Sequence, residues 1–294
     1  MRTLFRILSG VIFIVSAVAK LLSADTFELY VFSLGFFNLG LSFLAARVVI
    51  AVEFALGLWL ISGIKSKISV LSAMGLTATF SLFLLYLILV GSNENCHCFG
   101  ELVDLSPTQS LIKNLLILTI LFFALKSKSY NFKFSAIVVT ALFAISAATV
   151  VIVSPPDNWR YDSYAQNGFN MDAYQELLEA VPDDIASILA SDEEKVICFF
   201  SLECEYCRMT AKKLGILRND WEFAADSIIC LFPQTNGETE ITPEQFFEET
   251  GLYPNEYYTM PALQFVKSVS GYLPTVAIMK DATLVKEFGY RDLH

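Results

Sequence analysis

Cys204 and Cys207 are separated by two residues, which is the spacing of a redox-active dithiol. They follow an apolar run at 196–201 and open a segment, 204–214, whose apolar residues recur at helical spacing. A cysteine at a helix N-terminus lies at the positive end of the helix dipole, which lowers its pKa and favours the thiolate. A second cysteine about one turn later is close enough to resolve a mixed disulfide. The motif therefore predicts thiol–disulfide exchange, with Cys204 attacking and Cys207 resolving.

Two other uses of this motif remain open, a structural disulfide and one half of a zinc site. A zinc site of this kind needs a second Cys/His pair at finger spacing, and none follows in the sequence. The other cysteines of this half, Cys198 and Cys230, lie inside apolar, strand-like runs, where free buried cysteine is common. We expect both of them to be core residues.

A second pair of cysteines, Cys96 and Cys98, lies on either side of His97. Cysteines this close can form only a small, strained disulfide, and strain makes a disulfide easier to reduce. Metal binding by the three residues and a purely structural role are the alternatives, although adjacent residues cannot readily surround one tetrahedral ion. We expect this pair to exchange with the Cys204–Cys207 dithiol.

The direction of that exchange is predicted from the charges beside Cys204. Glu203 and Glu205 flank it, and negative neighbours disfavour a thiolate. A less stable thiolate makes the disulfide of this pair relatively more stable. On this argument, electrons move from the dithiol to the strained pair at 96–98.

Strand and helix patterns alternate around the dithiol. Strands are expected at 196–201 and 227–232, a helix at 242–251, and a strand–turn–strand pattern at 275–288. This order resembles the thioredoxin fold, in which a cis-proline before the penultimate strand faces the dithiol. Pro274 matches that proline better than Pro261, which no hairpin follows directly. The resemblance implies that Pro274 shapes the substrate groove.

The sequence departs from the thioredoxin pattern in several places. Glu203 stands where the family usually has Trp, and Ala282 replaces the usual turn glycine. The sequence ends at His294, where the last helix of the family would barely have begun. The spacing from the dithiol to the proline is longer than in a minimal thioredoxin, which predicts an insertion around 234–267.

The composition predicts a membrane protein. Hydrophobic residues make up 55% of the chain, charged residues 17%, and the mean hydropathy is +0.54, with the apolar residues in long blocks. The first block also resembles a signal peptide, but the further spans behind it favour a retained helix. The segment 30–44, which glycines interrupt, is expected to be an interfacial helix. Five spans are expected, at 4–22, 46–63, 68–90, 111–125 and 134–153.

The charges predict the orientation. Through residue 153, ten basic residues face six acidic ones, whereas ten face twenty-four in the remainder, so nothing indicates nucleic-acid binding. Basic residues precede the first span and occupy the loops at 65–67 and 126–133, and the alternate loops are acidic apart from Arg47. The positive-inside rule then places the N-terminus in the cytoplasm and both cysteine pairs outside. In a bacterium, this outer compartment is the oxidising periplasm, where disulfides persist.

Several motifs of the membrane half resemble the MauE branch of the DoxX-like membrane proteins. They are CHCFG at 96–100, a Ser-Pro helix start at 106–107, Lys113-Asn114-Leu115, SAVAKL at 16–21 and EFALG at 53–57. The resemblance covers roughly residues 1–126, with Lys113 where the family more often has Arg, and it implies a compact four-helix membrane domain. The methylamine utilisation protein MauE is associated with maturation of the disulfide-rich small subunit of methylamine dehydrogenase, alongside a separate thioredoxin-like partner. This chain would combine both parts.

Two residues of these motifs, Lys20 and Glu53, are charged within apolar spans. Ionised side chains are costly in a membrane and are usually paired or functional. Lys20 is close to a span end and can also reach the interface by snorkelling. Glu53 lies seven residues after the expected start of its span, or roughly 10 Å, on the side of Cys96 and Cys98. A pair between them would be structural or would handle protons of thiol exchange. The predicted supporting residues are Lys20, Glu53, Lys113 and Asn114.

The predicted fold class is a membrane α-helical bundle followed by an α/β thioredoxin-like domain. A four-helix MauE/DoxX-like core is expected at 1–126, a fifth transmembrane helix at 127–153, a linker with a helical extension at 154–194, and the thioredoxin-like domain at 195–294. The predicted function is a membrane-anchored thiol–disulfide oxidoreductase that acts on protein thiols and disulfides outside the cytoplasm.

Two alternatives remain for this function. One is a dedicated assembly factor for a disulfide-rich client such as methylamine dehydrogenase. The other is a quinone-linked oxidoreductase, by analogy with other DoxX-like proteins and with fusions of vitamin K epoxide reductase to thioredoxin. No nucleotide, flavin or haem motif is visible and no metal is expected, so no cofactor is evident apart from the quinone of the last alternative. The expected partners are the lipid bilayer, protein thiols and, for the last alternative, a quinone.

Overall fold

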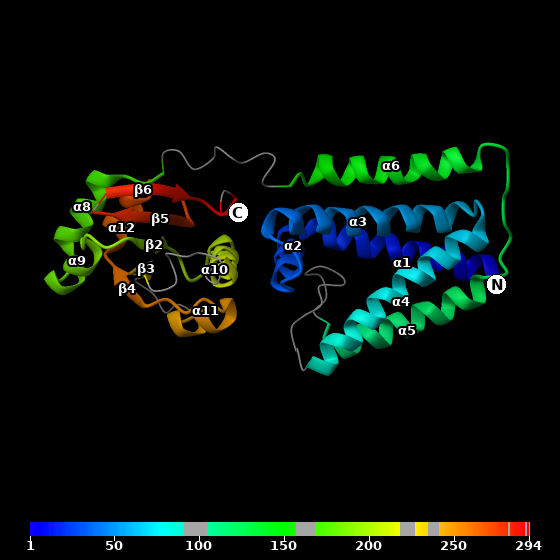
Figure 1. Cartoon of the computed structure of the whole chain (residues 1–294), viewed down its shortest axis with the longest axis horizontal. Coiled ribbons are helices and arrows are strands. Elements are labelled where there is room, and N and C mark those ends of the chain that lie inside the picture. Colours follow the sequence, from blue (N-terminus) through cyan, green and yellow to red (C-terminus); the bar gives the residue numbers. More distant parts are fainter. Residues whose placement is uncertain are drawn as a thin grey trace. The chain divides into compact units, whose positions relative to one another are not determined.

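The computed structural model describes residues 1–90, 105–156, 168–217, 227–234, 241–281, 283–291 and 293. The chain divides into two compact units, Met1–Pro156 and Asp157–His294. The first unit contains the long apolar helices and the second contains the sheet (Figure 1).

In the described residues of the first unit, five helices are long and apolar enough to cross a membrane, and they pack into a bundle. The chain is therefore a multi-pass membrane protein. The first of these helices packs on the second and the third on the fourth, and the fifth also lies along the second (Figure 1). The five helices are α1 (Arg2–Leu22), α3 (Leu39–Ser62), α4 (Ser66–Val90), α5 (Pro107–Ala124) and α6 (Ser135–Val153).

Helices α1 and α3 cross at two glycines. A Cβ atom on Gly57 would lie 2.9 Å from the carbonyl oxygen of Gly10, and one on Gly10 would lie 2.8 Å from the carbonyl oxygen of Gly57. Small residues let helix backbones approach closely where no water drives the association. The glycine of the EFALG motif at 53–57 therefore allows the close contact between the two helices.

The expected interfacial helix at 30–44 is wrong in its bounds. Helix α2 (Ala24–Ser33) ends earlier, and Gly35 adopts a φ of +71° in the bend that follows. The Asn38 side chain then accepts a hydrogen bond of 2.9 Å from the backbone N–H of Leu41 and begins α3. Because this cap starts a new helix, residues 39–44 belong to the second span. Glu53 is consequently fourteen residues from the helix start, near its middle, and not seven.

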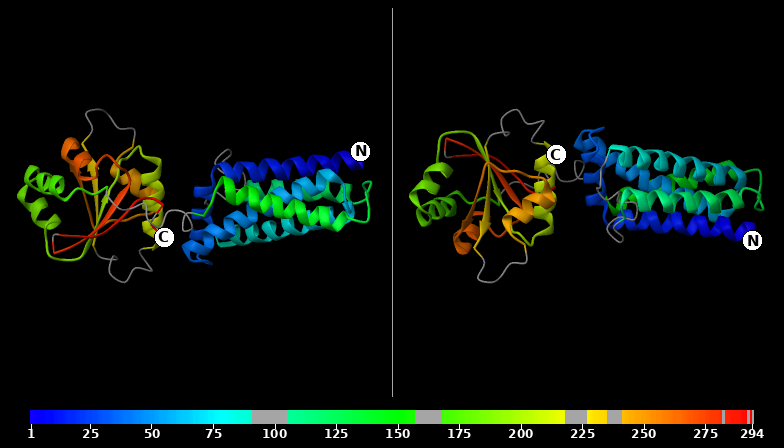
Figure 2. Two further views of the ribbon diagram at one scale, coloured as in Figure 1. Left: turned by 90° about the horizontal axis from the view of Figure 1, so that it is seen from above. Right: turned by 90° about the horizontal axis from the view of Figure 1, so that it is seen from below.

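The second unit is a five-stranded mixed sheet with helices on both faces (Figure 2). The strand order is β4-β3-β2-β5-β6. The first three strands in this order are parallel, and the last two run antiparallel to their neighbours. The strands are β2 (Lys195–Phe199), β3 (Ile228–Pro233), β4 (Glu256–Met260), β5 (Thr275–Lys280) and β6 (Thr283–Phe288).

Alternate residues of the central strands face different helices. Phe199 belongs to a core with residues of α8, α9 and α12, whereas Phe200 and Phe232 pack against Phe246 of α11, with ring centroids 5.8 and 5.5 Å apart. Helix α10 lies beside α11 (Figure 2). The helices are α8 (Met171–Ala180), α9 (Asp183–Leu189), α10 (Glu205–Leu217), α11 (Pro243–Thr250) and α12 (Ala262–Ser268).

The strands and the helix expected around the dithiol are confirmed. Thr242 caps α11 in a reciprocal capping box with Gln245, and Gly251 ends the helix in the left-handed conformation. The expected insertion before Pro274 contains β4 and α12, and β4 forms the sheet edge beside β3. The expected turn at 281–282 lies partly outside the described residues.

Candidate functional site

The dithiol lies at the N-terminus of α10, which begins at Glu205 directly after the first cysteine. The Cys207 N–H donates to the Cys204 sulfur at 3.2 Å, and the Ser201 N–H donates to the Cys207 sulfur at 3.5 Å. Cys204 is partly exposed, whereas the Cys207 residue is 0% exposed. Both thiols are free in this structure. The helix start that the sequence predicted is confirmed, and it places one sulfur near solvent and the other inside the domain.

The two thiols differ in acidity. The pKa of Cys204 is lowered to about 7, first by a hydrogen bond from the Cys207 thiol, against an opposing effect of burial. Backbone N–H groups of Cys207 and Tyr206 and the charge of Arg208 lower it further. Burial raises the pKa of Cys207, and its hydrogen bond to Cys204 raises it again. Near neutral pH, Cys204 is therefore the thiol that ionises, while Cys207 stays protonated.

The expected effect of Glu203 and Glu205, which would disfavour the Cys204 thiolate, does not prevail, because the pKa of Cys204 is lowered, as the helix start predicted. Both carboxylates belong to exposed residues, where solvent screens their charge. The backbone donor of Cys207, in contrast, touches the sulfur directly. The direction of electron flow that was predicted from these two carboxylates is therefore not supported by the pKa of Cys204.

Pro274 follows a cis peptide bond from Leu273, as the resemblance to thioredoxin predicted. It is buried and directly precedes Thr275, which pairs with Phe199 at the end of β2. The chain leaves β2 at that end and continues to Cys204. The proline and the dithiol therefore lie at the same end of the central strands β2 and β5. The rival residue, Pro261, precedes α12 as its N-cap.

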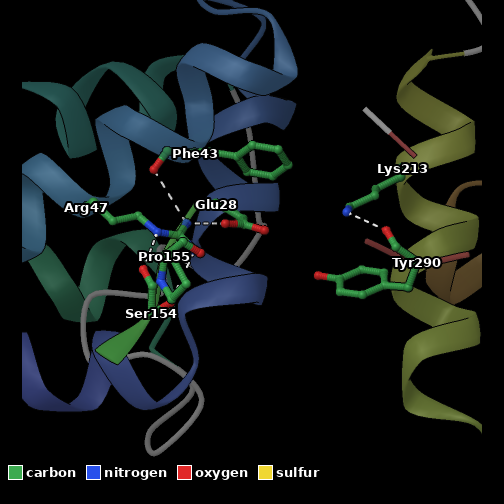
Figure 3. Close-up of polar contacts among 7 residues, drawn as sticks. All are labelled: Glu28, Phe43, Arg47, Ser154, Pro155, Lys213 and Tyr290. Atoms are coloured by element: carbon green, nitrogen blue, oxygen red, sulfur yellow. Dashed lines mark hydrogen bonds and ion pairs between the residues drawn. The ribbon is translucent and has the colours of Figure 1, made fainter. Parts of the chain in front are cut away.

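Tyr290, near the end of the sequence, contacts helix α10, which follows Cys204. Lys213 of α10 is 0% exposed, donates a hydrogen bond of 2.9 Å to the Tyr290 carbonyl oxygen, and lies 3.9 Å from the centre of the Tyr290 ring (Figure 3). The same ring lies 5.3 Å from that of Tyr206, inside the dithiol motif. Sequence reasoning missed this contact. A lysine on the apolar side of a predicted helix was the available signal.

The other two cysteines of this domain lie side by side on neighbouring strands. Cys198 and Cys230 are register partners in β2 and β3, and each is 0% exposed. Both are free, as expected of core cysteines. Burial raises the pKa of Cys230, and a hydrogen bond with Cys198 raises it further. Their pairing was not predicted, since it depends on the strand register.

The charged residues of the membrane unit form an ion pair between α1 and α3. The Lys20 ammonium lies 2.7 and 2.9 Å from the two carboxylate oxygens of Glu53, and both side chains are buried. Ser16 joins them: it accepts from Lys20 at 2.9 Å and donates to Glu53 at 3.1 Å. Lys20 is therefore held inside the bundle and does not extend along the surface.

A cavity of about 330 Å³ adjoins this ion pair. Residues from α1, α2, α3, α4 and α5 line it, and most of them are apolar. All four residues that the sequence analysis named as supporting, Lys20, Glu53, Lys113 and Asn114, lie in its wall. The structure thus brings together residues that are widely spaced in the sequence.

A second ion pair in this unit, between Arg47 and Glu28, is also buried. Arg47 pairs with Glu28 and donates to the carbonyl oxygens of Ser154 and Pro155 at 3.1 and 3.3 Å (Figure 3). It also donates to the Ser154 hydroxyl at 3.2 Å. Arg47, the exception to the loop-charge pattern, is thus neutralised by Glu28 and joins α3 to the end of α6.

The predicted pair Cys96 and Cys98 lies outside the described residues, together with His97. Within the part of the chain that is described, no group of three or more His, Cys, Asp or Glu side chains is arranged to hold a metal ion.

Comparison with known proteins gives two matches. Residues 1–127 match the family described as methylamine utilisation protein MauE. The chain is 26% identical over 298 residues to a protein of Flavobacterium psychrophilum named Protein TlpB, covering 85% of this chain and 80% of that protein. No solved structure matches the chain. The chain therefore carries a MauE membrane domain at residues 1–127 followed by an α/β thioredoxin-like domain.

Proposed function

We propose that this protein is a membrane-anchored thiol–disulfide oxidoreductase that acts on protein thiols and disulfides outside the cytoplasm. The main support for this proposal is the difference between the two thiols of the dithiol. Cys204 is partly exposed and has a pKa of about 7, whereas Cys207 is buried and has a raised pKa. This is the arrangement that a nucleophile and a resolving thiol need.

The reaction follows from these two positions. The Cys204 thiolate attacks one sulfur of a client disulfide, forms a mixed disulfide, and releases the other client sulfur as a thiolate. Cys207 then loses its proton and attacks the Cys204 sulfur, which closes the Cys204–Cys207 disulfide and frees the client as a dithiol. Run in reverse, the same steps oxidise a client. Pro274, at the same sheet edge, shapes the groove that receives the client chain.

The dithiol also exchanges with Cys96 and Cys98 in this proposal. A tether makes an encounter between two groups of one chain intramolecular, with an effective concentration of about millimolar order. Exchange between the two cysteine pairs then needs no high affinity.

The finer division of the chain is proposed as 1–126 for the MauE core, 127–153 for the fifth transmembrane helix, 154–194 for the extension and 195–294 for the thioredoxin-like domain.

The proposed orientation has the N-terminus in the cytoplasm and both cysteine pairs outside, on the loop-charge argument. A membrane-impermeant thiol reagent tests it in intact cells after reduction. Cys204 should be labelled, whereas a Lys67→Cys probe between α3 and α4 should not be. Lys67 is exposed, while the neighbouring Ser66 is buried and would escape the reagent from either side. Labelling of the Lys67→Cys probe from outside would overturn the orientation.

An insulin-reduction assay tests the function with the purified full chain, dithiothreitol as the reductant and Cys204→Ser as the control. Turnover of insulin that depends on Cys204 supports a general oxidoreductase. Turnover that is equal in the Cys204→Ser variant would contradict the proposal.

A dedicated assembly factor is the second candidate, and the MauE match favours it, because that family is described by methylamine utilisation. Such a factor would hold one disulfide-rich client, for example a methylamine dehydrogenase-like subunit, while its disulfides form. It predicts no turnover of insulin but covalent capture of one client by the Cys207→Ser variant. Capture of many unrelated proteins would exclude it.

A further inference from the structure

The cavity in the membrane unit has room for one hydrocarbon chain. Its volume of about 330 Å³ lies at the lower end of the range of small-molecule pockets, roughly 300–1,000 Å³. An apolar cavity of about 150 Å³ already admits benzene, so this one has room for roughly twice as many carbons, on the order of a dozen. The two acyl chains of a phospholipid exceed that volume. Because the walls come largely from membrane-spanning helices, a ligand of this cavity arrives through the lipid.

The polar and apolar parts of the cavity are separated along its helices. On α1 the lining extends from Ile12 to Lys20, a rise of about 12 Å over eight residues. On α5 it extends from Lys113 to Ile117. Helices α1 and α5 run in opposite directions (Figure 1), so both lysines lie nearer than both isoleucines to the same end of the bundle. An amphiphile, with a polar head and an apolar chain, matches this division.

The charges of the wall determine which head the cavity favours. Three charged side chains of the described residues line it, Lys20, Glu53 and Lys113. Both carboxylate oxygens of Glu53 already face the Lys20 ammonium, at 2.7 and 2.9 Å. With Lys113 included, the lining carries two ammonium groups and one carboxylate. Because unbalanced charge is costly at membrane depth, an anionic head complements this wall, whereas a cationic head is repelled by it.

Asn114 provides a hydrogen-bond donor next to Lys113 in the sequence. It is 5% exposed and lines the cavity, and within the described residues the structure records no hydrogen bond of its amide. A buried amide without a partner is costly, and a ligand oxygen that accepts a hydrogen bond from its N–H removes that cost. A carboxylate has two oxygens and can accept from the Asn114 amide and from an ammonium group at the same time.

We propose that this cavity binds an amphiphile with one hydrocarbon chain and a carboxylate head, the chemical class of the fatty acids. The carboxylate accepts hydrogen bonds from Asn114 and Lys113, and the chain extends along the apolar lining toward the middle of the bundle. The site is separate from the dithiol and does not depend on the proposed oxidoreductase function. Anionic phospholipids share the negative charge of the head, and the number of chains distinguishes them from a fatty acid.

The test uses the full-length protein in nanodiscs of zwitterionic phosphatidylcholine, with radiolabelled laurate as the probe. Empty nanodiscs measure the laurate that only partitions into the lipid. Saturable binding of about one laurate per protein is expected above this background, in keeping with the volume of the cavity. Dodecanol has the same chain without the charge. It should compete about tenfold less well than unlabelled laurate, because a hydrogen bond to a charged group is the stronger one.

Three variants test the wall. Lys113→Gln removes one charge and should weaken laurate binding about tenfold, while dodecanol binding stays within about twofold of the wild type. Asn114→Leu should weaken laurate binding about fivefold, the value of one hydrogen bond. Ala45→Trp, which fills the cavity from α3, should abolish the binding of both compounds. Insulin reduction by each variant shows that the protein is folded.

Each variant has a matched control at an exposed residue that does not line the cavity, and all three controls should bind laurate like the wild type. They are Lys67→Gln, Thr119→Val and Val48→Trp. Equal competition by dodecanol and laurate would overturn the anionic head. Displacement of laurate when phosphatidylglycerol is added to the nanodiscs would assign the site to a phospholipid and overturn the ligand with one chain. Wild-type binding of laurate by Lys113→Gln and Ala45→Trp would overturn the site itself.

Discussion

The thioredoxin-like domain holds two pairs of cysteines that differ in almost every respect except their residue type. In each pair, one thiol is hydrogen-bonded to the other. Cys204 and Cys207 lie at the start of a helix, where backbone N–H groups and Arg208 stabilise one thiolate near solvent. Cys198 and Cys230 lie in the middle of the sheet at 0% exposure, where burial raises the pKa of Cys230.

This difference shows that the thiol pair alone does not make a redox centre. The start of α10 provides backbone N–H groups that donate to the Cys204 sulfur, and it leaves this sulfur accessible to solvent. The sheet provides neither, because its N–H groups bond to neighbouring strands and its two cysteines are buried. The comparison predicts a reactive pair at the helix and an inert pair in the sheet, and each of the following variants tests one side of it.

The largest expected effect is that of Cys204→Ser, which should reduce thiol–disulfide exchange to the uncatalysed background. The hydroxyl is not ionised near neutral pH, so no nucleophile remains at the exposed position. Insulin reduction by the full chain measures the loss, and Cys198→Ala is the matched control on the inert side. Substantial exchange in Cys204→Ser would assign the attacking thiol elsewhere.

Cys207→Ser should remove turnover but leave the first attack intact. Mixed disulfides with clients should then accumulate, because only the resolving step is lost. Non-reducing electrophoresis followed by identification of the trapped proteins measures them. Cys230→Ala, with the dithiol unchanged, should trap none. Trapping by Cys204→Ser at the same level would contradict the roles assigned to the two thiols.

The pH dependence separates the pairs without a mutation. Alkylation of Cys204 by iodoacetamide should rise about tenfold per pH unit below neutrality and level off above pH 7, because its pKa is lowered to about 7. Cys198 and Cys230 should stay unreactive throughout the range in which the domain is folded. A midpoint near the ordinary cysteine value of about 8.5 would contradict the effect of the helix start.

The same lowered pKa affects the stability of the reduced fold. The Cys204 contribution is complete above the ordinary cysteine pKa of about 8.5, and it is lost as the pH falls through about 7. Denaturation of the reduced protein at several pH values should show this trend, and Cys204→Ser should remove it.

The smallest effect on activity is expected for Cys198→Ala and Cys230→Ala. Each removes one buried sulfur from a packed sheet, which should lower the free energy of unfolding by about 1 kcal/mol. Insulin reduction should stay within about twofold of the wild type at a temperature where both are folded. A large loss of activity without a loss of stability would place this pair in the redox path.

Local patterns predicted much of this protein. The apolar blocks predicted the membrane spans, because a span is recognised from the hydropathy and length of one continuous segment. The Cys204–Cys207 spacing at a helix start and the Thr242 helix with its capping box are likewise short-range features. The break between α2 and α3 was misplaced, although Gly35 and Asn38 carry its signal.

Other features depend on contacts between residues far apart in the sequence. Lys20 and Glu53 are 33 positions apart, and Lys213 and Tyr290 are 77 apart. Their charges and apolar surroundings identified Lys20 and Glu53 as unusual, but only the packing of α1 on α3 pairs them and places both beside a cavity. The alignment of Cys198 with Cys230 similarly depends on the register of β2 and β3. A sequence pattern reports how a residue suits its own helix or strand, whereas partners and cavities arise where separate elements meet, which the chain reaches only by folding.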